Sequence, residues 1–132
     1  MSMVFVDTSG FYAVLDRDDG NHVPAKAAWE RMVGEARLLT NNYVLVETAA
    51  LVQHRLGMAA VQAFTSDVLP LLDVEWVSMQ RHQAAWEAVL AAGRRDLSLV
   101  DCVSFGTMRE YGARQAFCFD RHFAEQGFDI VP

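Results

Sequence analysis

The chain has 132 residues, of which 52% are hydrophobic, and it carries a formal net charge of −6. This length suits one domain, so we expect a single domain over residues 1–132, and the hydrophobic content excludes a disordered chain. The acidic balance argues against a general nucleic-acid coat protein, because such proteins bind phosphates through a basic surface. It does not exclude an enzyme whose carboxylates hold divalent cations, since those cations reverse the local field.

The N-terminal segment and the cysteines both bear on the compartment. Residues 1–10 are largely apolar but include an aspartate, and they lack the basic region of a signal peptide. No apolar run approaches the roughly 20 residues that would span a bilayer. Cys102 and Cys118 lack a metal-type or CxxC spacing and lie among apolar neighbours, which indicates buried free thiols in a reducing compartment. We therefore expect a cytoplasmic protein.

Short apolar runs alternate with segments of helical periodicity, which is typical of an α/β fold with a parallel sheet. The expected strands cover residues 3–6, 37–40, 74–77, 116–119 and 128–131. The expected helices cover about residues 10–15, 24–35, 43–56, 59–69, 80–92 and 99–111. Candidate capping residues precede three of these helices: Thr8 or Ser9, Asn41 or Asn42, and Ser98.

The tryptophans and histidines give no independent sign of a site. Trp29, Trp76 and Trp86 fall on periodic positions, so we expect them in the core rather than as a base-stacking platform. The four histidines are scattered, and no pair has a ligand-like spacing on one expected helix face. His54 follows Glu47 by about two helical turns, but a partly buried helix residue is the expected role.

Four acidic residues stand out by their position. Asp7 and Asp120 directly follow apolar runs that we predict as parallel strands, and ligands of open α/β sheets bind beyond the carboxyl ends of strands. Glu47 and Asp101 lie in apolar helical segments, so we expect both to be shielded from the surface. An isolated carboxylate among apolar residues is costly, and it either shifts its pKa or finds a cation.

The chemistry of such a group of carboxylates points to metal ions. Several carboxylates at one sheet edge would repel one another unless cations neutralise them. Oxygen ligands alone favour Mg²⁺ or Mn²⁺ over zinc. Two such ions about 4 Å apart are a known arrangement for in-line attack of activated water on a phosphodiester.

Each carboxylate also has a structural explanation, and these alternatives stay open in the sequence. Asp7 could open a turn, and Asp120 could form a turn or a helix cap. Asp101 lies three residues after Ser98, which matches a capping box. Glu47 could form a buried ion pair with an arginine.

Three further polar residues are candidates for a supporting role. Thr8 and Ser9 could hydrogen-bond a metal ligand or a metal-bound water, although capping a helix would also explain them. Asp96 could be a peripheral acidic group or a solvated loop residue.

The ordered set of motifs resembles that of the PIN-domain nucleases. The runs that carry the resemblance are residues 4–9, 46–49, 97–104 and 117–123, and they are most similar to the VapC-like toxin branch. The resemblance implies a three-layer α/β/α fold with a central parallel sheet in the order 3-2-1-4-5. It also implies an Mg²⁺- or Mn²⁺-dependent endoribonuclease, a homodimer and a small antitoxin partner. The residues it assigns as catalytic and metal-binding are Asp7, Glu47, Asp101 and Asp120, with Thr8 and Ser9 in support.

We therefore predict that metal-activated water hydrolyses RNA phosphodiesters, leaving a 5′-phosphate and a 3′-hydroxyl, and that the protein is the toxin of a toxin–antitoxin module. A PIN-fold ribonuclease outside such a module and a non-catalytic domain that binds RNA or a protein partner are the alternatives. A phosphate-transferring enzyme with an aspartyl nucleophile is disfavoured. No second aspartate follows Asp7 by two residues, and Lys26 is the only lysine.

Overall fold

The computed structural model describes residues 2–132, and five parallel strands form one sheet in the order β3-β2-β1-β4-β5. The strands are β1 (Ser2–Val6), β2 (Ala36–Asn41), β3 (Leu72–Glu75), β4 (Gln115–Phe117) and β5 (Asp129–Val131). The α-helices are α1 (Thr8–Leu15), α2 (His22–Met32), α3 (Asn42–Leu56), α4 (Met58–Ala63), α5 (Met79–Ala92), α6 (Leu99–Tyr111) and α7 (His122–Glu125). A π-helical turn, η1 (Phe64–Val68), and a 3₁₀ turn, η2 (Leu69–Leu71), follow α4. The expected strand order is confirmed.

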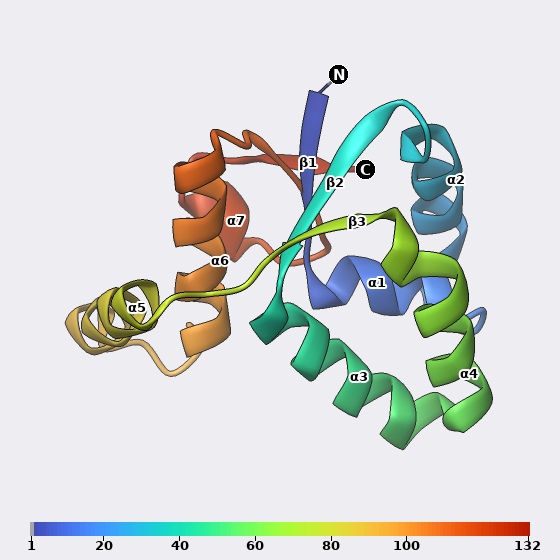
Figure 1. Ribbon diagram of the computed structural model, residues 1–132, viewed down its shortest axis with the longest axis horizontal. Coiled ribbons are helices and arrows are strands. Elements are labelled where there is room, and N and C mark those ends of the chain that lie inside the picture. The colour runs from blue at the N-terminus through green and yellow to red at the C-terminus, as the bar shows by residue number, and fades with distance from the viewer. Residues whose placement is uncertain (1) are drawn as a thin grey trace.

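Helices cover both faces of the sheet and produce three layers (Figure 1). Helices α5, α6 and α7 lie on one side, and α1, α2 and α4 lie on the other. Helix α3 begins directly after β2 and contacts both α1 and α6. The expected α/β/α architecture is therefore confirmed.

The central strand β1 is buried on both faces. Residues 4–6 are all buried, as expected for a parallel strand between two helical layers. Phe5 stacks on Phe123 of α7 with 6.0 Å between the ring centroids. In the α1 layer, Phe11 packs edge-on against Phe64 at 5.2 Å. These contacts hold β1 in place, and with it Asp7, the residue that directly follows the strand.

The order in which strands are added to the sheet changes direction at β1. Strands β2 and β3 are added on one side of β1, and β4 and β5 on the other. Val6 pairs with Phe117, so β1 and β4 reach their carboxyl ends side by side. Ligands of open α/β sheets bind at such a switch point. The residues that follow these two strands are therefore placed where a site is expected.

Several element boundaries differ from the prediction. The third strand lies at Leu72–Glu75 rather than 74–77, and the fourth ends at Phe117 rather than 119. The regular helix expected over 59–69 ends at Ala63, and Pro70, which has no backbone N–H to donate, lies in the 3₁₀ turn that follows η1. Helix α7 was not predicted, because a helix of 4 residues is too short to show a periodicity.

The prediction for two of the tryptophans was wrong. Trp76 is 76% exposed because it directly follows β3, an edge strand. Trp86 is 46% exposed because it lies on α5, which packs against α6 and buries only Ala85. Trp29 does pack against the core, as predicted. His54 was expected to be partly buried but is exposed on α3.

Two further expectations concern the cysteines and the membrane. Cys102 and Cys118 are buried free thiols, as predicted. Across residues 2–132, none of the helices has both the length and the apolar character needed to cross a bilayer.

Candidate metal centre

Asp7 is the first residue beyond β1 and forms the N-cap of α1. Its Oδ2 accepts hydrogen bonds from the Ser9 hydroxyl at 2.9 Å and from the Ser9 amide at 3.3 Å. Asp7 is only 5% exposed, and burial raises the pKa of its carboxyl group to about 7, with a smaller contribution from the charges of Asp101 and Glu47. The expectation that Thr8 or Ser9 caps this helix was wrong, because α1 begins directly after the strand and leaves Asp7 as the extended residue that caps it.

Ser9 connects Asp7 to the loop after β4. Its hydroxyl accepts a hydrogen bond from the Phe119 amide at 2.9 Å while it donates to Asp7. Residue 119 immediately precedes Asp120. The Ser9 hydroxyl therefore fixes two of the predicted site carboxylates relative to each other.

Thr8 connects the start of α1 to α3 in a similar way. Its hydroxyl donates to the carbonyl oxygen of Val44 at 3.4 Å and accepts from the Thr48 hydroxyl at 3.1 Å. Thr48 is the residue after Glu47. Both predicted supporting residues thus hold neighbouring elements in place.

Asp101 lies in the first turn of α6, where it completes a capping box. Its amide donates to Ser98 Oγ at 3.1 Å, and its Oδ2 accepts from the Ser98 amide at 3.0 Å. Burial raises the pKa of the Asp101 carboxyl group, and repulsion from Asp120 raises it further. Asp101 therefore caps α6 and also lies beside the other carboxylates.

Glu47 lies on α3 and differs from the prediction in its exposure. It lines the same cavity as Asp7 but is exposed to solvent, so the expected shielded position was wrong. The apolar neighbours Ala50 and Leu51 do not cover it, because the side of α3 that faces the cavity is open to water. Within residues 2–132 Glu47 forms no ion pair with an arginine, which removes the alternative explanation for it.

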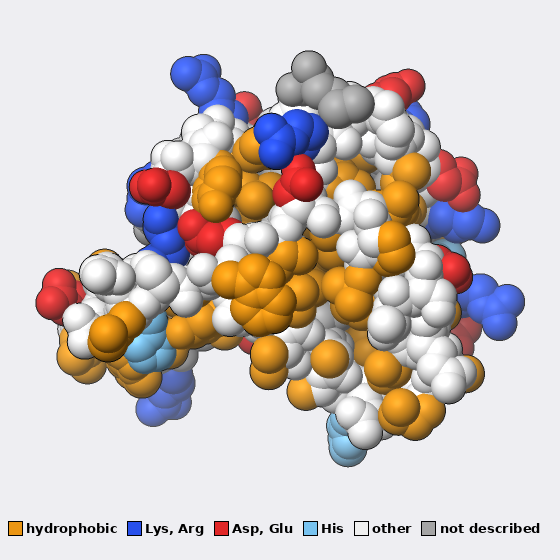
Figure 2. Space-filling view, viewed as in Figure 1, with side chains coloured by type: hydrophobic (Ala, Val, Ile, Leu, Met, Phe, Trp, Pro, Cys, Tyr) orange, Lys and Arg blue, Asp and Glu red, His pale blue; other side chains and the backbone are white. Residues whose placement is uncertain are grey.

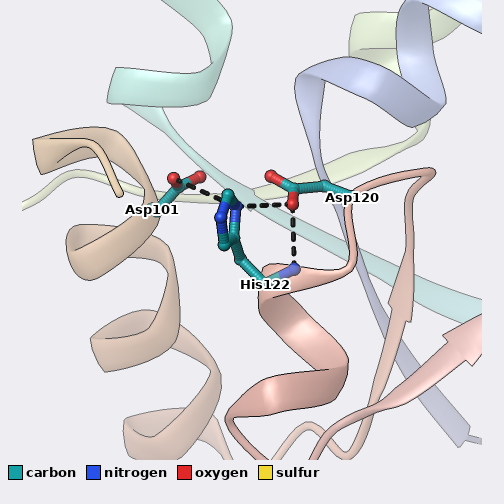
Figure 3. Close-up of side chains that lie close together, drawn as sticks. All are labelled: Asp101, Asp120 and His122. Carbon is teal, nitrogen blue, oxygen red and sulfur yellow. Dashed lines mark hydrogen bonds and ion pairs between the residues drawn. The ribbon is translucent and has the colours of Figure 1, made fainter. Parts of the chain in front are cut away.

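Asp120 lies in the loop between β4 and α7, three residues beyond the end of the strand and not directly after it as predicted. Its Oδ1 accepts a hydrogen bond from the His122 amide at 2.9 Å. The His122 ring lies between the carboxylates of Asp120 and Asp101 (Figure 3), with Nδ1 at 2.7 Å from Asp120 Oδ1 and 3.9 Å from Asp101 Oδ2. One atom from each of these three residues falls within 4.8 Å of the others, a grouping that could hold a metal ion. Sequence reasoning missed His122, although its place two residues after Asp120 was a usable signal.

All four predicted carboxylates meet in one cavity of about 440 Å³. The lining residues are Asp7, Thr8, Ser9, Glu47, Leu51, Ser98, Asp101 and Asp120. Within residues 2–132 no arginine or lysine forms an ion pair with any of the four carboxylates. Such an uncompensated group of oxygen donors suits a hard divalent cation.

Comparison with known proteins agrees with this geometry. The model of the PIN domain family matches residues 4–129. The chain belongs to the PIN-domain family.

This PIN domain is 36% identical over 127 residues to the 23S rRNA-specific endonuclease VapC20 of Mycobacterium tuberculosis, in strains CDC 1551 and H37Rv, over 96% of this chain and 95% of that relative. The crystal structure of M. tuberculosis VapC20, a sarcin–ricin loop cleaving toxin, matches with a TM-score of 0.86 and 35% identity over 98% of this chain and 99% of that chain. Two further structures share only the fold. VapBC2 of Rickettsia felis, bound to a DNA fragment from its promoter, matches with a TM-score of 0.70 at 10% identity over 97% of this chain and 96% of that chain. FitAcB of Neisseria gonorrhoeae matches with a TM-score of 0.70 at 12% identity over 98% of this chain and 97% of that chain.

The protein is thus a VapC-type PIN-domain endoribonuclease, as the sequence motifs predicted. PIN nucleases are metal-dependent, and the acidic cluster of this PIN domain agrees with that requirement.

Proposed function

We propose that this PIN domain cleaves 23S rRNA and that Asp7, Glu47, Asp101 and Asp120 are its catalytic, metal-binding carboxylates. The observation that carries the proposal is the convergence of these four residues on one cavity, where none of the arginines or lysines described within residues 2–132 forms an ion pair with them. A buried carboxyl group such as that of Asp7 is unfavourable in its charged form unless a cation accompanies it. Thr8 and Ser9 support the site through the hydrogen bonds that hold α3 and the Asp120 loop.

Mg²⁺ or Mn²⁺ is the proposed cofactor, because the donor set is dominated by carboxylate oxygens. In such a centre the metal supplies activation of water for in-line attack on phosphorus and neutralises charge at the leaving oxygen. The donor atoms are held just beyond β1, on α3, on α6 and on the β4–α7 loop, so that the phosphodiester would be bound in one orientation. The expected products carry a 5′-phosphate and a 3′-hydroxyl.

The sarcin–ricin loop is the proposed substrate, and the support for it is the similarity to VapC20 along nearly the whole chain. Sequence-specific recognition of RNA targets loops whose bases are splayed out, which fits an open cavity. A substrate in the ribosome would place the protein in the cytoplasm.

Cleavage of a 23S rRNA fragment that contains the loop tests this proposal. With Mn²⁺ or Mg²⁺, we expect wild type to cut within the loop, and Asp7→Asn to lower the rate by at least about 100-fold. The matched control is Asp67→Asn, at an exposed position of η1, which should cleave like wild type. Primer extension maps the cut. If the Asp7 variant cleaves as fast as wild type, Asp7 has no catalytic role. If wild type cleaves a scrambled loop as fast as the native loop, the sarcin–ricin loop is not its specific substrate.

We also propose that a small antitoxin inhibits this endoribonuclease, as in the toxin–antitoxin modules of its family. The acidic, solvent-open cavity suits a basic side chain such as arginine, which would take the place of the metal charge. Co-expression with the product of an adjacent small gene should yield a stable complex and suppress cleavage. Failure of both would indicate a nuclease that acts outside such a module.

A homodimer is the proposed oligomeric state. Its support in this chain is a set of exposed apolar residues on α5, namely Met79, Trp86 and Leu90. A non-catalytic RNA- or partner-binding domain is disfavoured, because such a domain would have no need of four converging carboxylates.

A further inference from the structure

His122 has one ring nitrogen inside the metal centre and the other outside it. The side chain is 12% exposed, and Nδ1 faces the carboxylates of Asp120 and Asp101 (Figure 3). The contact of Nδ1 with Asp120 is short at 2.7 Å but does not have the geometry of a hydrogen bond. Among the described residues this buried nitrogen therefore has no hydrogen-bond partner. A buried polar atom without a partner requires an explanation.

The outer nitrogen indicates which tautomer the neutral ring adopts, the form in which a histidine binds a metal ion. Nε2 lies 3.1 Å from Asp96 Oδ2. Arg94 holds the same Asp96 carboxylate through two further contacts, at 3.1 and 3.0 Å. A carboxylate can only accept hydrogen bonds, so Nε2 carries the hydrogen of the neutral ring. The lone pair of the neutral imidazole is then on Nδ1, which points at the acidic cluster.

The distances around Nδ1 suit ligands of one ion. At metal–ligand distances of about 2.1 Å, adjacent ligands of an octahedral ion lie about 3 Å apart and opposite ligands about 4.2 Å apart. The contacts of Nδ1 with Asp120 and Asp101 are 2.7 and 3.9 Å, and all three donor atoms lie within 4.8 Å of one another. Two atoms that both present lone pairs at 2.7 Å repel each other unless a proton or a metal ion relieves the repulsion, and a metal ion bound by both atoms would take the place of that proton.

We propose that His122 Nδ1 is a ligand of the divalent ion that Asp101 and Asp120 bind, and that Asp96 orients the ring from behind. This inference rests on the metal centre of the proposed function and extends it by a nitrogen ligand. A metal-bound histidine whose other ring nitrogen donates its N–H to a carboxylate is a recurrent arrangement, and the carboxylate fixes both the tautomer and the orientation of the ring.

A nitrogen ligand changes the metal preference of the centre. Carboxylate and water ligands suit Mg²⁺, whereas imidazole binds first-row transition metals more readily. The site therefore discriminates in favour of Mn²⁺ over Mg²⁺ by more than a centre of carboxylates alone. The sequence offered two interpretations of Asp96, a peripheral acidic group or a solvated loop residue. In this proposal Asp96 is a positioning residue that orients the His122 ring.

Pulsed EPR on Mn²⁺ bound to the full chain tests the coordination directly. In wild type we expect the hyperfine coupling of a directly bound ¹⁴N, replaced by the ¹⁵N pattern in labelled protein. His122→Gln should lose this coupling. The matched control His54→Gln, at an exposed position on α3, should retain it.

Calorimetry gives a second readout that does not depend on activity. His122→Gln should raise the Kd for Mn²⁺ by at least about tenfold and the Kd for Mg²⁺ by less, so that the ratio between the two metals narrows. Asp96→Asn keeps the ligand but removes the carboxylate that fixes its tautomer, and it should raise the Kd for Mn²⁺ by about tenfold.

The outcomes separate this inference from the proposed function. If wild type binds Mn²⁺ and cleaves RNA but shows no nitrogen coupling, His122 is not a ligand, and the four-carboxylate centre remains. If the coupling persists in His122→Gln, the nitrogen comes from another residue, which also overturns the inference. If wild type binds no divalent ion and cleaves no RNA, both proposals fail.

Discussion

At the scale of single residues, Asp7 places a carboxyl group in the core of the protein. Its folded-state pKa of about 7 lies above the value near 4 of an exposed aspartate, chiefly because burial disfavours the charge. Below pH 4 both the folded and the unfolded chain carry the proton, and the group costs nothing. Between about pH 4 and pH 7 only the unfolded chain releases the proton, so the free energy of unfolding falls as the pH rises. Well above pH 7 the free energy of unfolding falls no further, because Asp7 is then ionised in both the folded and the unfolded chain.

The Asp7→Asn variant should therefore be more stable than wild type when no metal is present. Asparagine keeps an oxygen for the two hydrogen bonds from Ser9 but cannot become charged. In EDTA at pH 8 we expect a gain of up to about 4 kcal/mol in the free energy of unfolding. At pH 4 the two proteins should differ little. Urea denaturation at both pH values measures this, and an equal difference at pH 4 and pH 8 would contradict the burial argument.

Individual site residues differed in how far the sequence could locate them. Asp7 and Asp101 were predictable because local rules, a strand end and a capping box, fix their backbone. The exposure of Glu47 was not, because helical periodicity reports which residues are apolar and not which face borders a cavity. His122 was missed for a related reason. Its contact with Asp101 joins two helices distant in sequence, one of them too short to detect.

At the scale of elements, the position of α1 against β4 depends on one glycine. A Cβ atom on Gly10 would lie 2.5 Å from the carbonyl oxygen of Phe117 and 2.4 Å from a carbon of its ring. Backbone atoms cannot move aside as a flexible side chain can. The absence of a side chain at Gly10 thus lets the N-terminus of α1, with Asp7 and Ser9, lie against the end of β4.

We expect Gly10→Ala to lower the free energy of unfolding by about 1–3 kcal/mol, the usual cost of overpacking a core. It should also weaken Mn²⁺ binding, because α1 must move away from the Asp120 loop. Gly20→Ala is the control, since nothing lies within 4 Å of a Cβ atom at that position. Thermal unfolding and calorimetry measure the two effects. A Gly10 variant with unchanged stability would show that the contact can relax.

Elements with strong local signals were predictable, and those fixed by tertiary contacts were not. Helices α3, α5 and α6 begin at the polar caps Asn41, Ser78 and Ser98, and their expected ranges are close to the observed ones. The end of β4 and the turn of α7 depend on pairing with β5 and on packing of Phe123. Neither leaves a periodic pattern in the sequence.

At the scale of the whole molecule, apolar side chains remain at the surface. Figure 2 shows hydrophobic side chains gathered over the end of β3 and the start of α3, with others on α5. On α5 they are Met79, Trp86 and Leu90, whose spacing of seven and four residues places them on one helix face. A large exposed apolar surface on a single chain usually marks a contact site.

Leu90→Arg should shift the proposed homodimer towards the monomer, because it places a charge within the apolar contact. Light scattering after size-exclusion chromatography should give twice the mass of the chain for wild type and a lower mass for the variant. Val23→Arg on α2 provides the control, since Val23 is equally exposed but lies on a different helix. A wild-type mass equal to that of one chain would disprove the homodimer.

The strand order also determines when during synthesis the proposed metal centre can assemble. A chain completed only through α6 contains Asp7, Glu47 and Asp101 but has neither β4 nor Asp120. The strand that pairs with β1 on this side of the sheet is then missing. The loop whose Phe119 amide donates to the Ser9 hydroxyl is missing as well. Because metal binding and folding are coupled, such a partial product has no assembled centre. If the proposed centre is the catalytic one, a ribosome can therefore complete most of this chain before the chain is able to cleave RNA.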